Sequence, residues 1–330
     1  MAELGFIQAI NQAIEEEMRR DPSVIVLGED VRAIGAPLGE FKGLYNKFGA
    51  DRVIDTPISE TAIMGAAIGA AATGLRPIAN IMYANFLGVC GDEMVNQLTQ
   101  MRYMGGGEVK VPVTIMSYSG AGTRHAAQHS RNLYGWLMNI TGLKIIAPST
   151  PYDAKGLLKS ALRENNPTIF LYHTALIKRG IKSEVPAEEY TIPLGKADVK
   201  REGKDVTIVA MALTVHEALA AANTLQEKGI SIEVVDPRTL VPLDKETIIN
   251  SVKKTGRLIV FDEEPKTGSA AAEIAAIVAD EAFDYLDAPI KRVCAPDTPV
   301  PYSPVLEDFW IPDQKDLIEA VTELVPASRN

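Results

Sequence analysis

A single carboxylate stands where a predicted strand and turn lead into a helix of small residues. Glu60 ends the segment Asp55–Glu60 (DTPISE), and Gly65–Ala72 (GAAIGAAA) follows it closely. A positioned, partly desolvated carboxyl group can act as a general acid or base. A glutamate at a helix start also interacts favourably with the positive end of the helix dipole. Local sequence therefore leaves both an acid–base role and a structural role open for Glu60.

Two histidines four residues apart, His125 and His129, lie in a stretch rich in small and polar residues. On a helix this spacing would put both imidazoles on one face, where they could hold a metal ion, but no third ligand is apparent. A neutral imidazole can also take up or release a proton near physiological pH. The residues therefore favour proton transfer over metal binding.

Glycines after a predicted strand raise the question of a phosphate-binding loop. Gly120-Ala121-Gly122 begins like G-x-G-x-x-G, but His125 occupies the third glycine position and would block the close approach of helix and strand. The sequence has no G-x-x-x-x-G-K-[ST] loop and no Gly-Asp-Gly…Asn motif for diphosphate and magnesium. We therefore expect a flexible loop here, and a free-standing nucleotide-dependent oxidoreductase is disfavoured.

Apolar stretches alternate with helical patterns, which is typical of α/β layering around a largely parallel sheet. The segment 180–196 has no clear period, so we expect domains at 1–190 and 191–330. In the first, the expected helices cover 1–20, 58–73, 92–103 and 152–163, and the expected strands cover 23–28, 75–83, 111–117, 142–147 and 168–172. In the second, strands at 206–211, 231–236, 257–262 and 289–294 alternate with helices at 215–228, 244–255 and 270–280, which predicts a doubly wound domain.

The composition is that of a globular protein. The 330 residues exceed one typical core, and 46% of them are hydrophobic while 23% are charged. Cys90 and Cys294 follow no metal-ligand spacing and are expected to be buried, reduced thiols. The acidic N-terminal helix does not suit a signal peptide, and no stretch reaches the ~18 apolar residues of a membrane span. We expect a cytoplasmic protein with no membrane partner.

Charge is spread unevenly along the chain. Residues 1–190 carry 18 Lys+Arg and 19 Asp+Glu, whereas residues 191–330 carry 15 and 24. Phosphate binding needs a basic surface, so nucleic acid is disfavoured as a partner. The acidic second part favours a basic protein partner, although simple solubility would explain the same charge.

Short segments spread along the chain form an ordered series. They are Leu27–Val31 (LGEDV), Asp55–Glu60, Asn85-Phe86, Ala126–Ser130 (AAQHS), Pro148–Gly156 (PSTPYDAKG) and Pro299–Pro304 (PVPYSP). This series resembles the β subunits of thiamine-diphosphate-dependent 2-oxo acid dehydrogenases and acetoin dehydrogenases, and the resemblance covers nearly the whole chain. It implies a pyrimidine-type thiamine-diphosphate domain at 1–190, followed by a transketolase C-terminal-like doubly wound domain at 191–330.

The resemblance also implies roles for particular residues. In the family the α chain holds magnesium and diphosphate, and the β chain holds the aminopyrimidine. Glu60 matches a glutamate that hydrogen-bonds a ring nitrogen and helps to form the ylid. Phe86 matches an aromatic residue packed against the ring, which is compatible with a place in the core. His129 matches a histidine implicated in proton transfer and in passing the acyl group to a lipoyl arm. Arg124 matches an arginine of the acetoin-type members without an assigned role.

Partners and a cation follow from the same resemblance. It implies an α2β2 heterotetramer with an α subunit, and a lipoyl acyltransferase that binds the complex. It also implies a monovalent cation, usually potassium, held mainly by backbone carbonyls, which a helix C-terminus leaves free. The family usually has aspartate at the fourth of these positions. The matching positions are Val113, Ala161, Leu162, Glu164 and Asn166.

The chain departs from the family pattern in three places. Arg131 and Asn132 replace Gln-Ser after His129-Ser130, and Asn139 replaces a second histidine. These changes bear on substrate preference, loop order and acyl transfer. Segments 88–90 and 298–308 look most like acetoin dehydrogenase β subunits, with pyruvate and then branched-chain 2-oxo acid dehydrogenases as alternatives. A non-catalytic scaffold is the alternative of another class, which intact Glu60, Phe86 and His129 argue against.

Overall fold

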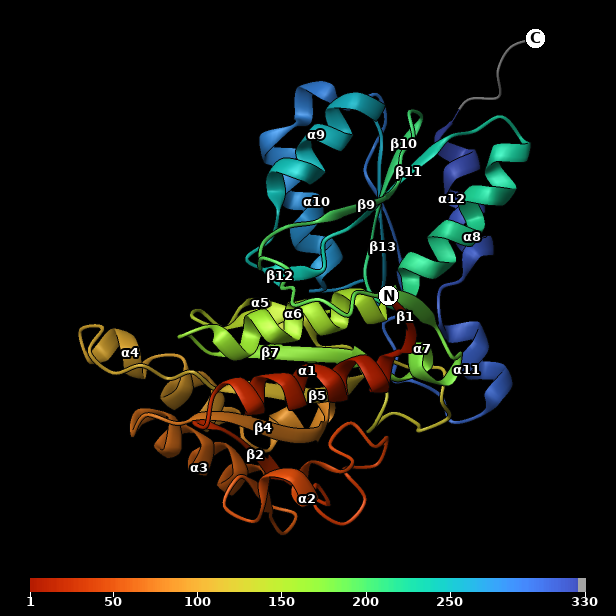
Figure 1. Ribbon diagram of the computed structural model, residues 1–330. Helices are drawn as coiled ribbons and strands as arrows, with labels where there is room; N and C mark the ends of the chain where they lie inside the picture. The colour runs from red at the N-terminus through yellow and green to blue at the C-terminus, as the bar shows by residue number, and fades with distance from the viewer. Residues whose placement is uncertain (326–330) are drawn as a thin grey trace. The chain divides into compact units, whose positions relative to one another are not determined.

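The computed structural model describes residues 1–325. The chain forms two compact units, which Figure 1 shows coloured along the sequence. The first unit comprises Met1–Ser119 and Leu137–Leu194, and the second comprises Gly120–Trp136 and the described residues from Gly195 onward. The division into domains 1–190 and 191–330 stays a prediction. Among the described residues, none of the helices combines the length and apolarity needed to span a bilayer.

Parallel strands form the centre of the first unit. They lie in the order β6-β7-β5-β4-β2-β3, and each neighbouring pair is parallel. The β-branched strand β2 is buried along its whole length, as expected for a strand of a parallel sheet. The strands are β2 (Val24–Gly28), β3 (Val53–Asp55), β4 (Arg76–Tyr83), β5 (Thr114–Ser119), β6 (Lys144–Ile146) and β7 (Thr168–His173).

Helices connect these strands. The small-residue helix that the sequence predicted after Asp55 is α3, and Gly74 follows its end with a positive φ of 105°. Helix α5 (Tyr134–Met138) begins in the second unit and ends in the first. The others are α1 (Phe6–Arg20), α2 (Leu44–Phe48), α3 (Glu60–Ala72), η1 (Ala84–Gly88), η2 (Glu93–Leu98), α4 (Met101–Met104), α6 (Pro151–Arg163) and α7 (Thr174–Lys178).

The structure corrects three expectations for this unit. The helix expected at 92–103 is a π-helix, η2, followed by the separate short helix α4. The strand expected from residue 111 begins only at Thr114, because Pro112 cannot donate a ladder hydrogen bond. Residues Ala2–Gly5 are not helical but form β1, antiparallel to β8 (Lys182–Val185). Both strands of this pair are only four residues long and largely exposed, so neither has the buried apolar face that marks a strand.

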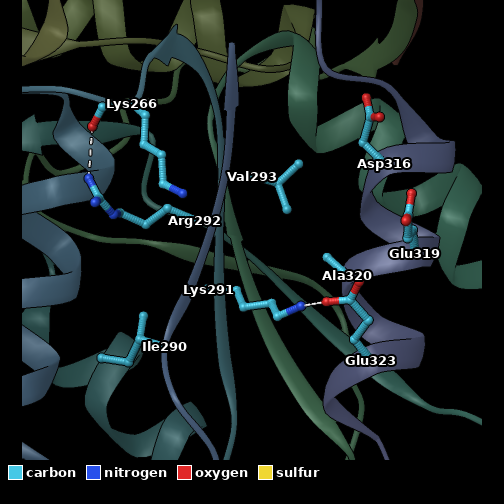
Figure 2. A pocket seen from close by; sticks show the side chains of 9 residues that line it. All are labelled: Lys266, Ile290, Lys291, Arg292, Val293, Asp316, Glu319, Ala320 and Glu323. Atoms are coloured by element: carbon cyan, nitrogen blue, oxygen red, sulfur yellow. Dashed lines mark hydrogen bonds and ion pairs between the residues drawn. The ribbon is translucent and has the colours of Figure 1, made fainter. Parts of the chain in front are cut away.

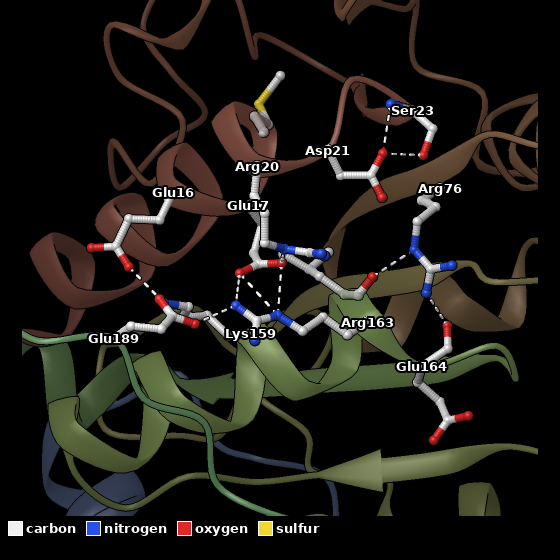
Figure 3. A network of polar contacts seen from close by, with 12 residues as sticks. Glu16, Glu17, Arg20, Asp21, Ser23, Arg76, Lys159, Arg163, Glu164 and Glu189 are labelled. Carbon is white, nitrogen blue, oxygen red and sulfur yellow. Dashed lines mark hydrogen bonds and ion pairs between the residues drawn. The ribbon is translucent and has the colours of Figure 1, made fainter.

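Buried ion pairs fasten α1 to α6 (Figure 3). The carboxylate of Glu17, on a side chain only 1% exposed, accepts hydrogen bonds from Arg163 Nε at 3.0 and 3.1 Å and from Arg20 Nε at 2.8 Å. One turn earlier on α6, the fully buried Lys159 pairs with Glu16 at 2.8 Å and with Glu189. These pairs join two helices whose sequences lie more than a hundred residues apart.

The second unit is a smaller doubly wound domain, as the sequence predicted. Its strands lie in the order β14-β13-β10-β11-β9, and only β9 at the edge is antiparallel to its neighbour in this sheet. Helices α8 and α12 pack on one face, and α9 and α10 lie on the other (Figure 1). The sequence did not predict β9, α11 or α12.

The strands of the second unit are β9 (Asp198–Arg201), β10 (Val206–Ala210), β11 (Ile232–Asp236), β12 (Thr239–Val241), β13 (Leu258–Pro265) and β14 (Lys291–Ala295). Its helices are α8 (Leu213–Glu227), α9 (Lys245–Thr255), α10 (Ala270–Glu281), η3 (Phe283–Tyr285), α11 (Pro304–Trp310) and α12 (Gln314–Leu324).

The Arg163–Glu17 contact predicts a measurable loss of stability. Arg163→Met should lower the free energy of unfolding by about 3 kcal/mol, because it removes the main donor to a carboxylate that water cannot reach. Arg19→Met is the matched control, since Arg19 is 65% exposed and pairs with Glu15 on its own helix; it should cost less than about 1 kcal/mol. Urea unfolding followed by circular dichroism measures both. Equal effects of the two substitutions would contradict this reading.

Candidate functional site

The carboxyl ends of three strands of the first unit define the candidate site. Ligands of open parallel sheets bind beyond the carboxyl ends of strands, where the strand order reverses. Here β3 pairs with one side of β2 and β4 pairs with the other, so the reversal lies at β2. The residues that come after these strands are Glu29 after β2, Glu60 after β3 and Phe86 after β4.

Glu60 is the first residue of α3, and it is 8% exposed. The side chain of the preceding residue, Ser59, makes no capping hydrogen bond. Glu60 is the acidic residue of the first turn, where a negative charge interacts favourably with the helix dipole. Thr61 Oγ1 donates to the carbonyl of Val89 at 3.0 Å. This bond ties the start of α3 to the segment that follows η1, the element that carries Phe86.

A second carboxylate, Glu29, lies close enough to Glu60 to respond to its charge. Desolvation raises the pKa of Glu29, and the negative charges of Glu60 and Asp30 raise it further. Neighbouring carboxyl groups favour a state in which one of them keeps its proton. We did not single out Glu29 from the sequence. Its position directly after the first strand of a parallel sheet was the available signal.

Phe86 begins a row of aromatic side chains. Its half-buried ring meets Tyr83 edge-on at 5.9 Å, and Tyr83 meets Tyr118 at 5.3 Å. Tyr118 in turn meets Tyr172 at 5.0 Å. The protein therefore supports Phe86 on one side and leaves part of it uncovered, which suits an aromatic residue that packs against a flat ligand.

A buried carboxyl group, Glu40, ends this aromatic row, and no sequence motif indicated it. The hydroxyls of Tyr118 and Tyr172 donate to Glu40 Oε1 at 2.5 and 2.7 Å. Burial raises the pKa of Glu40, although both hydroxyls act in the opposite direction. The three residues come from a loop and two strands far apart in sequence, so no local pattern could join them.

His129 belongs to the second unit, whereas Glu60 and Phe86 belong to the first. The segment around it is not helical, so His125 and His129 do not share a helix face. His125 Nδ1 lies 2.8 Å from Thr123 Oγ1. Within residues 1–325 there is no group of three or more His, Cys, Asp and Glu side chains that could hold a metal ion. The loop expected to be flexible is instead tethered, because Ala121 N donates to Glu263 Oε1 at 2.7 Å.

The five positions expected to hold a monovalent cation offer backbone oxygens. The carbonyls of Leu162 and Glu164 both accept hydrogen bonds from Arg76, at 2.8 Å for Leu162. Those of Val113 and Ala161 accept backbone amides at 3.0 and 3.1 Å. A carbonyl oxygen has two lone pairs, so each of the four keeps an acceptor position. The guanidinium of Arg76 thus lies at two of the five expected positions, and cation binding by this backbone stays a prediction.

The Glu164 carboxylate does not take part in such a site. It pairs with Lys144 and accepts the amide of Asn165 at 2.8 Å and Asn166 Nδ2 at 3.1 Å. Burial would raise the pKa of Glu164, but Lys144 and the Asn165 amide hold it below its usual value. The Glu164 side chain thus stabilises the loop that follows α6.

Comparison with known proteins agrees with this architecture. Residues 2–179 match the transketolase pyrimidine binding domain, and residues 195–317 match the transketolase C-terminal domain. A solved structure described as a split gene transketolase, inactive beta4 tetramer, superposes with a TM-score of 0.80 over 99% of both chains. At 23% identity, this likeness shows the fold.

Curated relatives extend over almost the full length. The chain is 51% identical to the acetoin:2,6-dichlorophenolindophenol oxidoreductase subunit beta of Bacillus subtilis and 50% identical to that of Cupriavidus necator, covering 98% of this chain and 97% of each relative. It is 46% identical to the pyruvate dehydrogenase E1 component subunit beta of Bacillus subtilis, over 98% of this chain and 99% of the relative. The predicted fold and family are thus confirmed. The chain belongs to the β subunits of the thiamine-diphosphate-dependent acetoin and 2-oxo acid dehydrogenases.

Proposed function

We propose that this chain is the β subunit of an acetoin dehydrogenase, which completes a thiamine-diphosphate site with an α subunit. The identity of 51% and 50% to two acetoin-oxidising β subunits, against 46% and 45% to pyruvate and 2-oxoisovalerate β subunits, carries the choice of substrate. The enzyme would cleave acetoin oxidatively and pass the acetyl group to a lipoyl acyltransferase. Pyruvate dehydrogenase is the second candidate.

The residues after β3 and β4 suit the aminopyrimidine part of the cofactor. A nearly buried carboxyl group, Glu60, would hydrogen-bond a ring nitrogen and hold or move a proton there. The half-buried ring of Phe86 would pack against the heterocycle. When bound, thiamine diphosphate supplies a nucleophilic carbon that adds to the substrate carbonyl. Magnesium and the diphosphate are assigned to the α subunit, because this sequence carries no motif for them.

His129 is proposed to act later, in proton transfer and in passing the acyl group to the lipoyl arm. An imidazole can donate and accept a proton near neutral pH, as both steps require. The side chain is half-buried and lies in a loop, as active-site residues often do.

The chain is further proposed to be cytoplasmic and to assemble into an α2β2 heterotetramer, and two exposed surfaces support the assembly. A side chain added at Gly65 or Gly69 of α3 would meet no neighbouring atom, so this helix presents a flat face for another helix. In the second unit, large apolar side chains stand exposed on and beside α11, and such clusters commonly mark protein interfaces. They are Tyr302, Val305, Leu306 and Phe309.

Removing the acid at Glu60 tests the central assignment. Glu60→Gln, assembled with the α subunit, should lower turnover of acetoin by about two orders of magnitude, because an amide cannot take part in the proton transfer. Glu184→Gln removes an exposed carboxylate of the same unit and should leave turnover unchanged. The measurement is steady-state turnover with acetoin, pyruvate and branched 2-oxo acids. Near-normal turnover of the Glu60 variant would rule out the assignment.

Docking of the lipoyl acyltransferase is proposed on the acidic second unit. Figure 2 shows a pocket of about 400 Å³ between β14 and α12. Lys291 on β14 pairs across it with Glu323, and Asp316 and Glu319 on α12 also line it. Carboxylates spaced along one helix face can meet a basic partner segment, and exposed charges act chiefly on the rate of association.

Salt should therefore weaken this docking. The Asp316→Asn/Glu319→Gln variant is expected to slow association with a basic domain of the acyltransferase and to reduce the salt dependence, because it removes two screened attractions. Glu227→Gln/Glu246→Gln is the control, with the same charge change on exposed positions outside the pocket. Association rates at low and high ionic strength measure both. Binding indifferent to salt would leave solubility as the explanation of the acidic charge.

A potassium ion at Val113, Ala161, Leu162, Glu164 and Asn166 completes the proposal. Replacing choline chloride by potassium chloride at equal ionic strength should raise the unfolding temperature, because an ion that binds only the folded state stabilises it. Sodium chloride serves as the control for a smaller ion. Identical unfolding temperatures in the three salts would show that the carbonyls bind no cation.

A further inference from the structure

A loop of the second unit is held by carboxylates from distant parts of the same unit. The segment Gly120–Trp136 carries His129 and runs from the end of β5 into the first residues of α5. Its beginning and its end are both fastened. Ala121 N donates to Glu263 Oε1 at 2.7 Å, and Gly135 N donates to Glu264 at 3.0 and 3.1 Å. A loop with so many backbone donors committed to carboxylates has a defined shape.

The strongest single anchor is Glu307 of α11. It is fully buried, and its carboxylate accepts hydrogen bonds from Gly122 and Arg124 of the loop. Gly122 N donates to Oε1 at 2.7 Å, and Arg124 N lies 3.2 Å from Oε2. Arg124 NH1 donates to Oε2 at 2.5 Å. One buried carboxylate thus satisfies two backbone amides and a guanidinium, where a neutral side chain would leave donors unpaired.

The same anchor supports a backbone conformation that the sequence disfavours. Arg124 and Ala126 have positive φ angles of 66° and 57°, a region that non-glycine residues seldom adopt. Such strain persists only where surrounding contacts impose it. The contacts of Arg124 with Glu307 are of this kind. The turn continues directly to the histidine, since His129 N lies 3.4 Å from the carbonyl of Ala126.

Further contacts restrict the conformation of the loop. Asn132, one of the departures from the family pattern, donates through Nδ2 to Glu263 Oε1 at 3.2 Å. A side chain at Gly135 would collide with the carbonyl of Gly268, so the two backbones lie in direct contact. Asp308, next to Glu307, contacts only the outer guanidinium nitrogen of Arg124, at 2.6 Å. The contacts on loop backbone thus belong to the buried carboxylates and not to the exposed one.

We propose that Glu307, acting through Arg124 and the backbone of residues 122–126, is a positioning residue that sets the place of His129. Glu307 touches neither substrate nor cofactor in this proposal. It holds the turn from which the imidazole projects. Without Glu307 the imidazole would still be present, but it would no longer be held in the same position. This inference rests on the proposed role of His129, and it gives Arg124 a function.

The test compares Glu307→Gln with Asp308→Asn in the complete enzyme assembled with its α subunit. Glu307→Gln should lower kcat for acetoin with a lipoyl acceptor about tenfold or more, with the Kd for thiamine diphosphate unchanged. Asp308→Asn should change neither quantity more than about twofold. Arg124→Gln should have an intermediate effect, because Glu307 keeps its two backbone donors. If Glu307→Gln fails to fold, Arg124→Gln alone carries the test.

A double variant separates positioning from general stability. If Glu307 acts through His129, adding Glu307→Gln to His129→Ala should cause no further loss of kcat. Additive losses, or a rise in the Kd for thiamine diphosphate equal to the fall in kcat, would overturn the proposal. So would a Glu307→Gln enzyme with the kcat of the wild type.

Hydrogen exchange provides a readout that does not depend on the reaction. The amides of residues 122–131 should exchange faster in Glu307→Gln than in Asp308→Asn. Unchanged exchange would overturn the anchor, even if the wild type is a fully active acetoin dehydrogenase. A wild type inactive with every substrate would instead refute the proposed function, and the exchange result would still decide whether Glu307 holds the loop.

Discussion

Withdrawing a carboxylate from water costs several kcal/mol unless hydrogen-bond donors meet it. Several buried glutamates accept hydrogen bonds from donors between 78 and 185 residues away, among them Glu17, Glu40, Glu263 and Glu307. Each therefore joins remote segments, and a wrong pairing would leave a buried charge unmatched. The entropic cost of closing such long loops rises only slowly with their length. These contacts select one arrangement of each unit and hold it there.

The candidate site of the first unit follows from the way parallel strands end. Because neighbouring strands point the same way, the residues after β2, β3 and β4 meet at one edge. A side chain at Gly28 would come within 2.8 Å of Asn80 Cβ, so only glycine allows β2 and β4 to approach this closely just before Glu29. Glu29 follows β2 and Glu60 follows β3, the parallel neighbour on the other side of β2, so the charge of Glu60 acts on Glu29. Two acidic residues that follow different strands thus lie close enough for the charge of one to raise the pKa of the other.

Periodicity along the chain predicted most of the parallel strands and the helices between them, but not β9, α11 or α12. It failed where a strand has no hydrophobic face, as in the exposed pair β1 and β8. It also failed where a single residue determines the start of a strand, as Pro112 does before β5. The candidate residues Glu60, Phe86 and His129 came from ordered motifs that resemble a family. Glu40 and Glu307 could not be found in this way, because their partners are distant in sequence and only the folded chain joins them.

The departures from the family pattern near His129 also have a physical reading. Asn132 contributes a hydrogen bond to the buried Glu263, and the positive charge of Arg131 opposes the rise in the pKa of Glu264, which burial and then Asp262 raise to about 8. Both replacements thus interact with the acidic residues that fasten the loop. A decaying scaffold would be expected to lose buried polar contacts, since each unpaired one destabilises the fold. In this chain Arg131 and Asn132 take part in such contacts, which favours a functional loop over a decaying one.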